Sequence, residues 1–258
     1  MKKFITSVLL ALSMAVPAVG FASETVKLEK ANIDLHNQQS LQRGAKYFVN
    51  YCMGCHSLSM SRYNRVATDL GLTPEQVQKN LIFTRTDGEL TKVGELMKNG
   101  MTPKYGKEAF GNPPPDLSLE GRLRGADWIY SFLKAFYKDP SRPFGVNNTV
   151  FASVGMPHIL WELQGTQELQ HAEEPAAGEH AKAADAHAAE PKLVLTSPGK
   201  LSPAEYDRVV LDITNFLVYV GEPGKLHRQS VGIWVLLFLV IFIVLAYFLK
   251  KEYWKDVH

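Results

Sequence analysis

The chain contains 258 residues, of which 28 are Lys or Arg and 26 are Asp or Glu, so its formal net charge is only +2. No block of basic residues stands out, so the charge gives no indication of a nucleic-acid partner, and we expect none. The length allows one or two domains, but part of it belongs to segments for export and membrane insertion.

The first 22 residues have the pattern of a secretory signal peptide. Lys2 and Lys3 precede an apolar run from Phe4 to Val16, and the small residue Ala22 closes a stretch that is suited to cleavage. We therefore expect a signal peptide at residues 1–22 and export of the chain that follows it.

A helix with an apolar stripe is predicted from about Leu41 to Cys52, because apolar and small residues recur there at intervals of three and four. The helix ends in the run Cys-Met-Gly-Cys-His at residues 52–56, which contains the only two cysteines of the chain. A Cys-x-x-Cys-His run is the pattern by which a protein attaches haem c. Gly44 and Phe48 look like the small-plus-aromatic pair that lets the first helix of a cytochrome c fold cross closely over its last helix.

Each residue type in this motif has a task in haem attachment. The thiols of Cys52 and Cys55 would add to the two vinyl groups on one edge of the porphyrin, and His56 would bind the iron as proximal ligand. A redox dithiol and half of a zinc site are the alternatives, but no second Cys or His pair at the spacing of a zinc site is evident. We expect one covalent haem c, and the single motif excludes a di-haem peroxidase.

Between residues 73 and 140 the sequence predicts two helices separated by a long irregular stretch. Thr73 and Pro74 provide the N-cap and the first residue of a short helix that reaches about Phe83. Scattered glycines and three consecutive prolines then indicate loops that cover a haem face rather than a regular sheet. A second helix, stopped by Pro140, carries its apolar residues on one side: Trp128, Ile129, Phe132, Leu133 and Phe136.

Residues 167–191 are rich in Ala, Glu and His and contain almost no large apolar side chain. Such a segment cannot bury enough apolar surface to offset the entropy that it loses on ordering, so we interpret it as a solvated, disordered insertion. Its histidines, His171, His180 and His187, are chemically able to bind a metal, but a plain polar tract is the favoured interpretation.

Two helices are predicted at the C-terminal end. Ser202 to Glu205 forms a capping box, and apolar residues continue at helical spacing to Gly221, which makes this segment the candidate closing helix of the soluble domain. Residues 231–249 carry no charge and are long enough to cross a bilayer once. Together with the signal peptide, this pattern predicts a periplasmic domain at residues 23–224, then a membrane anchor and a short cytoplasmic tail at residues 225–258.

The second axial position of the iron is not defined by the motif. Methionine is a common choice in electron-carrying c-type sites, because its thioether favours ferrous iron and raises the reduction potential. Three methionines are candidates: Met97, Met101 and Met156. Spacing from the haem motif alone favours Met97 or Met101 over Met156.

Several short runs occur in a specific order over nearly the whole mature chain, and a single C-terminal anchor follows them. They are Leu41-Gln42-Arg43-Gly44, His56-Ser57-Leu58, Arg62-Tyr63, Pro114-Pro115-Asp116-Leu117-Ser118, Gly155-Met156-Pro157, Gly221-Glu222-Pro223 and Arg228. In these runs the chain resembles the cytochrome c1 family of the bc1 complex. The resemblance implies that Met156 is the sixth ligand and that Arg124, or less directly Arg122, pairs with a haem propionate. Such a pair would compensate a partly buried carboxylate charge.

The resemblance also implies a fold and a function. The expected fold is mostly α, a cytochrome c-like haem domain with long loops and one C-terminal transmembrane helix. The expected role is that of a redox subunit of ubiquinol:cytochrome c reductase, which is not an enzyme on its own. Haem c would accept an electron from the Rieske iron-sulfur protein and pass it to a c-type cytochrome, with cytochrome b as a further partner. The expected location is the bacterial inner membrane, with the haem domain in the periplasm.

Two other functions fit parts of the sequence. A membrane-anchored monohaem cytochrome that feeds a terminal oxidase would use the same haem chemistry, but the runs outside the haem motif argue against it. An anchored thiol-disulfide oxidoreductase would use Cys52 and Cys55, but the alternating strands and helices of a thioredoxin-like fold are missing.

Overall fold

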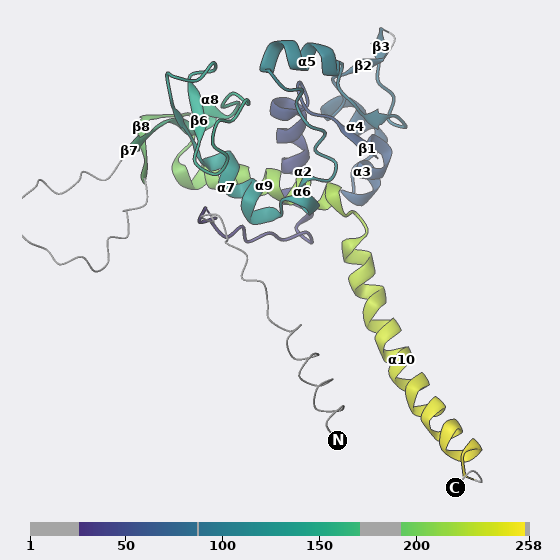
Figure 1. Cartoon of the computed structure of the whole chain (residues 1–258). Helices are drawn as coiled ribbons and strands as arrows, with labels where there is room; N and C mark the ends of the chain where they lie inside the picture. The colour runs from purple at the N-terminus through teal and green to yellow at the C-terminus, as the bar shows by residue number, and fades with distance from the viewer. Residues whose placement is uncertain (1–25, 87, 171–191, 256–258) are drawn as a thin grey trace, which may run out of the picture.

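A computed structural model of the chain describes residues 26–86, 88–170 and 192–255. Three sequence-based expectations lie wholly or partly outside these ranges: the signal peptide at 1–22, residues 171–191 of the insertion with its three histidines, and the end of the cytoplasmic tail at 256–258. Figure 1 shows short helices and strands gathered around two crossing helices, with one long helix projecting away from them.

The two crossing helices form the centre of the domain. They are α2 (Gln38–Tyr47), which continues as the short π-helix η1 (Phe48–Cys52), and α9 (Pro203–Gly221). A Cβ atom on Gly44 would stand only 2.0 Å from the carbonyl oxygen of Asp212 and 2.7 Å from the Cβ of Phe216. The rings of Phe48 and Phe216 are buried beside this point, with their centroids 5.8 Å apart. The predicted close crossing of the first and last helices is therefore confirmed.

A buried carboxylate ties the same two helices together. Asp212 accepts a hydrogen bond from the hydroxyl of Ser40 at 2.5 Å and a forked pair from Arg43, from Nε at 2.6 Å and from Nη2 at 2.9 Å. Asn215, one turn further along α9, donates to the same Ser40 hydroxyl and accepts from the backbone N–H of Asp34. Because a buried charge is tolerated only when it is paired, these contacts define which residues meet at the crossing.

The remaining helices of the domain are short. They are α3 (Tyr63–Asp69), α4 (Pro74–Asn80), α5 (Pro103–Phe110), α6 (Glu120–Leu123), α7 (Ala126–Lys134) and α8 (Trp161–Gln164). The N-cap predicted at Thr73 and the capping box predicted at Ser202 are both present, and Thr73 also forms a capping box with Gln76. However, α4 ends at Asn80 rather than at Phe83, and α7 ends at Lys134, so Phe136 lies in a strand rather than in the helix.

Within the described residues, four pairs of short antiparallel strands lie mostly where the sequence indicated loops. They are β1 (Leu58–Arg62) with β4 (Leu96–Met97), β2 (Arg85–Thr86) with β3 (Glu89–Leu90), β5 (Phe136–Lys138) with β6 (Val146–Asn148), and β7 (Gly165–Gln170) with β8 (Lys192–Pro198). Each of these sheets has only two strands, so the long loops are held by local strand pairs and do not form a larger sheet.

The β7 strand corrects one boundary. Gln167, the first residue of the predicted insertion, lies within β7, and its side-chain amide donates to the carbonyl oxygens of Lys134 at 2.8 Å and Phe136 at 2.9 Å. Cross-strand pairing with β8 continues as far as Gln170. The insertion therefore begins no earlier than residue 171, because residues 167–170 are held by a partner strand that the composition of the segment does not reveal.

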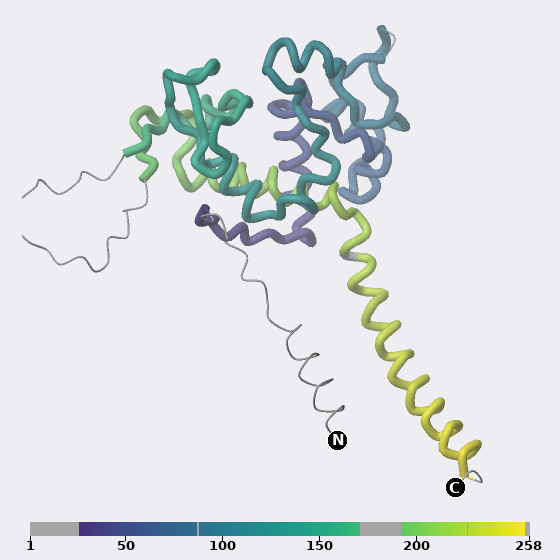
Figure 2. The backbone as a smooth tube through the Cα atoms, viewed as in Figure 1, coloured from purple at the N-terminus to yellow at the C-terminus, as the bar shows by residue number. Residues whose placement is uncertain are grey.

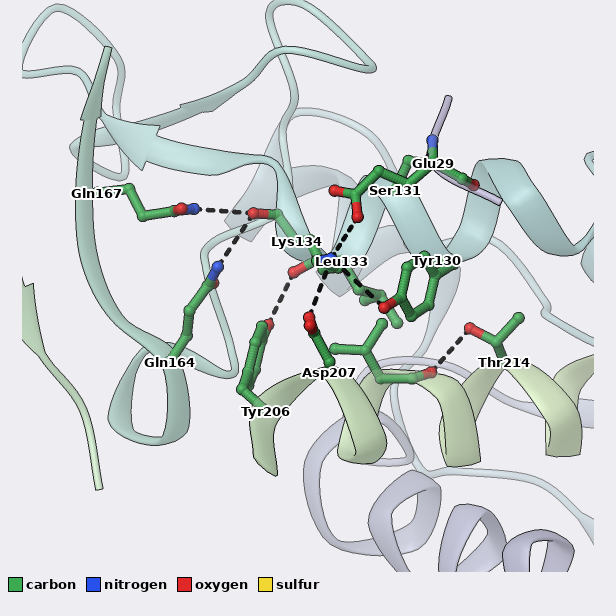
Figure 3. A network of polar contacts seen from close by, with 11 residues as sticks. Glu29, Tyr130, Ser131, Leu133, Lys134, Gln164, Gln167, Tyr206, Asp207 and Thr214 are labelled. Atoms are coloured by element: carbon green, nitrogen blue, oxygen red, sulfur yellow. Dashed lines mark hydrogen bonds and ion pairs between the residues drawn. The ribbon is translucent and has the colours of Figure 1, made fainter. Parts of the chain in front are cut away.

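Lys134 joins three parts of the chain at the end of α7 (Figure 3). Its ammonium group lies 2.5 Å from a carboxylate oxygen of Glu29, in the N-terminal segment, and 2.9 Å from one of Asp207, on α9. Nearby, the hydroxyl of Tyr206 donates to the carbonyl oxygen of Leu133. These contacts hold the N-terminal segment against α7 and α9.

The helix α10 (Lys225–Tyr253) follows α9 after a short break and projects away from the domain (Figure 2). Its stretch His227–Tyr253 is long and apolar enough to cross a membrane, and its side chains are exposed. Arg228 in its first turns pairs with Glu222, which links the start of α10 to the end of α9. This geometry fits the predicted C-terminal anchor.

Candidate functional site

The Cys-x-x-Cys-His run forms a tight turn at the end of η1. The backbone N–H groups of Cys55 and His56 both donate to the carbonyl oxygen of Cys52, at 3.0 Å and 2.9 Å. The two cysteines are not joined to each other in a disulfide, and Cys52 is buried. Burial raises the pKa of Cys52 to about 12 and also raises the pKa of Cys55, because a thiolate is poorly solvated there. The turn therefore places two sulfur atoms and an imidazole within five consecutive residues.

The orientation of His56 is set by a residue far away in the sequence. Its Nδ1 lies 2.7 Å from the carbonyl oxygen of Pro115, which can only accept, so Nδ1 carries the proton. The other ring nitrogen, Nε2, is then the unprotonated one and is able to bind a metal. Burial lowers the pKa of His56, which also favours the neutral, ligating form.

The run that supplies this carbonyl is itself attached to the segment after the motif. The N–H of Leu117 donates to the carbonyl oxygen of Ser57 at 2.9 Å, and the N–H of Ser59 donates to Asp116 Oδ2 at 2.9 Å. The Pro-Pro-Asp-Leu-Ser run thus acts as a brace that positions the carbonyl group of Pro115. Sequence reasoning found the run but not this contact, because no local pattern connects it to His56.

A cavity of about 420 Å³ opens beside the motif, which is within the range of cofactor sites. Cys52, Cys55 and His56 lie on its wall, and both helices of the crossing contribute to it. Most other lining side chains are aromatic or aliphatic, and they include Trp128, Ile129, Phe132, Leu133, Phe151, Ile213 and Leu217. The apolar stripe predicted on α7 therefore faces the cavity, whereas Phe151 carried no recognisable signal in the sequence.

The three candidate methionines occupy different environments. Met156 lies in the cavity wall, between Gly155 and Pro157. Met97 is fully buried in β4, where it pairs with Leu58 of β1 and belongs to the hydrophobic core. Met101 is not among the described residues that line the cavity. The preference for Met97 or Met101 from spacing alone is therefore not supported, because strand pairing directs Met97 into the core.

Arg124, rather than Arg122, lies at the cavity. Its guanidinium is 4.8 Å from the centre of the Trp128 ring, and its Nε is 3.6 Å from a carboxylate oxygen of Glu120. The side chain remains partly exposed, so the ion pair with Glu120 holds it only weakly. A guanidinium in this position is able to turn toward an anionic group at the cavity mouth.

These residues fit a covalently held haem. Two thiols and a histidine with a free Nε2 meet on one wall, a thioether lies in the same cavity, the remaining wall is apolar, and an arginine lies at the cavity. A helical domain closed by crossed N- and C-terminal helices around such a site is that of a c-type cytochrome.

Comparison with known proteins defines the family. The sequence model of a protein family described as "Cytochrome C1 family" matches residues 29–257, so the chain belongs to the cytochrome c1 family. Cytochrome c1 from Allochromatium vinosum is 52% identical, with 90% of each chain covered. A protein from Nitrosomonas europaea named ammonia monooxygenase gamma subunit is 43% identical, with 99% of this chain and 100% of that protein covered. Cytochrome c1 from Rhodospirillum rubrum is 26% identical, with 86% of this chain and 83% of that protein covered.

Family membership confirms several expectations from the sequence. The mostly helical haem domain, the single covalent haem c and the role in electron transport all agree with it. The chain is therefore a redox subunit of a larger complex.

Proposed function

We propose that this chain accepts one electron from the Rieske iron-sulfur protein of a bc1 complex and passes it to a c-type cytochrome. Membership of the cytochrome c1 family over almost the entire described chain is the observation that carries this proposal. Oxidation of quinol would occur elsewhere in the complex, with cytochrome b as a neighbouring subunit.

In this proposal each site residue has a separate task. Cys52 and Cys55 hold the haem covalently, His56 and Met156 are the axial ligands, and Arg124 pairs with a propionate. When bound, haem c supplies a one-electron couple between ferrous and ferric iron. The carbonyl group of Pro115 keeps His56 in its neutral, ligating tautomer.

The cavity walls would adjust the reduction potential. Aromatic and aliphatic side chains keep water away, which disfavours the more highly charged ferric state and raises the potential. The Met156 thioether acts in the same direction because it favours ferrous iron. Both effects suit a carrier that receives electrons from a high-potential donor.

We also propose that the chain is anchored in a bacterial inner membrane, with residues 23–224 in the periplasm. The apolar helix α10 supports the anchor, and the signal-peptide pattern of residues 1–22 supports the orientation. Residues 250–258 would then lie in the cytoplasm. An anchor this close to the closing helix would keep the haem domain at the membrane surface.

The relative from Nitrosomonas europaea carries a different name, ammonia monooxygenase gamma subunit. In this chain the haem motif, the cavity and the anchor all fit electron transfer.

The electron path is tested in membranes that contain the assembled complex. Addition of quinol should reduce the haem of this chain rapidly when the Rieske protein is present and hardly at all in membranes from a strain that lacks it. An unchanged rate of reduction without the Rieske protein would contradict the proposed donor. Haem that stays on the chain after denaturing electrophoresis would separately exclude the thiol-disulfide alternative.

A further inference from the structure

One residue near Met156 has a strained backbone. Ser153 has a φ of +59°, and it is the one non-glycine residue with a positive φ in the part of the chain that the structure describes. Residues other than glycine adopt this left-handed conformation only when surrounding contacts impose it. Only Val154 and Gly155 separate Ser153 from Met156.

Both backbone polar groups of Ser153 are held by side chains from the β5–β6 hairpin. Its N–H donates to the side-chain oxygen Oδ1 of Asn147 at 2.9 Å, and its carbonyl oxygen accepts from Arg142 Nη2 at 2.9 Å. Asn147 is in turn oriented by Asp139, whose Oδ2 accepts from its Nδ2 at 3.0 Å. The side chains of Asn147 and Arg142 therefore bind the backbone N–H and the carbonyl oxygen of the strained residue Ser153.

The β5–β6 hairpin, which carries Arg142 and Asn147, is itself held in place by strand pairing and by a hydrogen bond to α7. Its strands are in register, with Phe136 opposite Asn148 and Tyr137 opposite Asn147. The buried side chain of Asn148 accepts from the N–H groups of Val150 and Phe151 and donates to the carbonyl oxygen of Phe132 on α7. The first half of the segment 149–156, which we call the ligand loop, is thus fixed to the cavity wall.

We propose that Arg142 and Asn147 are positioning residues that hold the ligand loop in the conformation in which the Met156 thioether lies in the haem cavity. This inference rests on the assignment of Met156 as the axial ligand in the proposed function. These two side chains, which we call the clamp, would bias an equilibrium between two conformations of the ligand loop. In the closed loop the thioether would bind the iron, and in the open loop it would not.

Such an equilibrium is measurable with an added ligand. Imidazole binds ferric haem only where the methionine has left, so its apparent affinity is the intrinsic affinity multiplied by the open fraction. Losing one hydrogen bond of the clamp should raise that fraction, and with it the imidazole affinity, by about tenfold. The absorption band of the sulfur-to-iron bond should weaken in parallel.

The test uses the full-length, haem-loaded protein in detergent and titrates its ferric form with imidazole. Asn147→Ala and Arg142→Ala should each bind imidazole about tenfold more tightly than the parent. Arg142 is half-buried in the turn between β5 and β6 and is not part of the hydrophobic core, so its truncation leaves the core intact even if Asn147→Ala impairs folding. Ser141→Ala is the matched control, because Ser141 binds Asp139 in the same turn but does not touch Ser153.

A swap of two residues provides a rescue. Asp139→Asn combined with Asn147→Asp exchanges the amide and the carboxylate, so the hydrogen bond between them and the acceptor for the Ser153 N–H are both retained. This double variant should bind imidazole with nearly the parental affinity. Unchanged affinity in both alanine variants, or an equal increase in Ser141→Ala, would overturn the inference.

A variant at the ligand separates this inference from the assignment of Met156. In the Met156→Ala background, Asn147→Ala should have no further effect on imidazole affinity, because no thioether remains to be positioned. If Met156→Ala kept the sulfur-to-iron band, the ligand assignment itself would fail. If the band were lost but Asn147→Ala still changed imidazole affinity in that background, the clamp would not act through Met156.

Discussion

The Nδ1 atom of His56 lies 2.7 Å from the carbonyl oxygen of Pro115, although the two residues are 59 positions apart in the chain. This contact assigns the tautomer of the proximal ligand and depends on the brace formed by the Pro-Pro-Asp-Leu-Ser run. It also makes the neighbouring residue, Asp116, important for the site, because Asp116 helps to hold this run in place and its charge acts on His56.

Asp116 should therefore contribute stability that depends on pH. Burial would raise the pKa of Asp116, but hydrogen bonds from Ser118 and Ser59 outweigh it and lower the pKa below the ordinary aspartate range. A lowered pKa means that the stabilisation is present above the unfolded-state pKa, near 4, and is lost as pH falls through the folded-state pKa. Asp116→Asn should lower the unfolding temperature at pH 7, with a cost of about 1 kcal/mol.

The measurement is thermal unfolding of parent and variant at pH 7 and at about pH 3. The difference in unfolding temperature should shrink at the lower pH, because the parent carboxylate is then increasingly protonated. A difference that stayed constant over this range would show that the charge of Asp116 plays no part.

Replacing Met156 should change the potential without releasing the haem. Met156→Ala keeps Cys52, Cys55 and His56, so covalent haem should remain, but the thioether that favours ferrous iron is gone. Redox titration should show a potential lower by about 0.1 V or more. Met101→Ala is the control and should keep both the potential and the sulfur-to-iron band. The opposite pattern would assign the ligand to Met101.

Gly44 should tolerate no side chain at the helix crossing. A Cβ would approach the Asp212 carbonyl oxygen to 2.0 Å, so Gly44→Ala must push α2 and α9 apart at the centre of the core. We expect a loss of about 3 kcal/mol in the free energy of unfolding, measured by chemical denaturation. Gly94→Ala is the matched control, because a Cβ at that position meets no atom within 4 Å. Equal stability of the two variants would show that the helices separate without cost.

Removing residues 171–191 should leave the haem site intact. The deletion spares Gln167–Gln170, which pair with β8, and it removes only a polar segment with little apolar surface to bury. A short glycine-serine turn would rejoin the two strands. Haem content and reduction potential should match the parent, whereas a deletion that also removes Gln167–Gln170 should lower the stability. Loss of haem in the shorter deletion would identify a structural element in the insertion.

A chain that ends at Gly224 should be a soluble protein with haem and a nearly unchanged potential. The axial ligands and the cavity wall all precede this residue, and the side chains of α10 are exposed rather than packed on the domain. Quinol-dependent reduction of cytochrome c in membranes should fall sharply, because the tether that keeps the domain at high effective concentration near its donor is lost. Full membrane activity of the truncated chain would show that α10 is dispensable for assembly.

Features that depend on neighbouring residues were predictable from the sequence. The Cys-x-x-Cys-His run, the N-caps at Thr73 and Ser202, and the apolar length of α10 each involve residues within a few positions or one continuous segment. Their chemistry is local, so the order of residues was sufficient to identify them. The close approach at Gly44 was expected from a resemblance, because Gly44 and Phe48 look like the small-plus-aromatic pair at the helix crossing of a cytochrome c fold.

Other features required the tertiary structure, because they join residues that are far apart in the chain. Spacing favoured Met97 or Met101, but pairing of β4 with β1 buries Met97 in the core and leaves Met156 in the cavity wall. The strand that holds Gln167 has its partner on the far side of the insertion, so composition alone misplaced that boundary. The carbonyl group of Pro115 lies 59 positions from His56, whereas the side chains that bind Ser153 are only 6 and 11 positions away. In both cases the partner is a backbone atom, and backbone atoms are the same in every sequence, so no pattern of side chains reveals these contacts. The sequence by itself therefore determined which cofactor this protein carries, whereas only the folded chain decided which distant groups surround and orient its ligands.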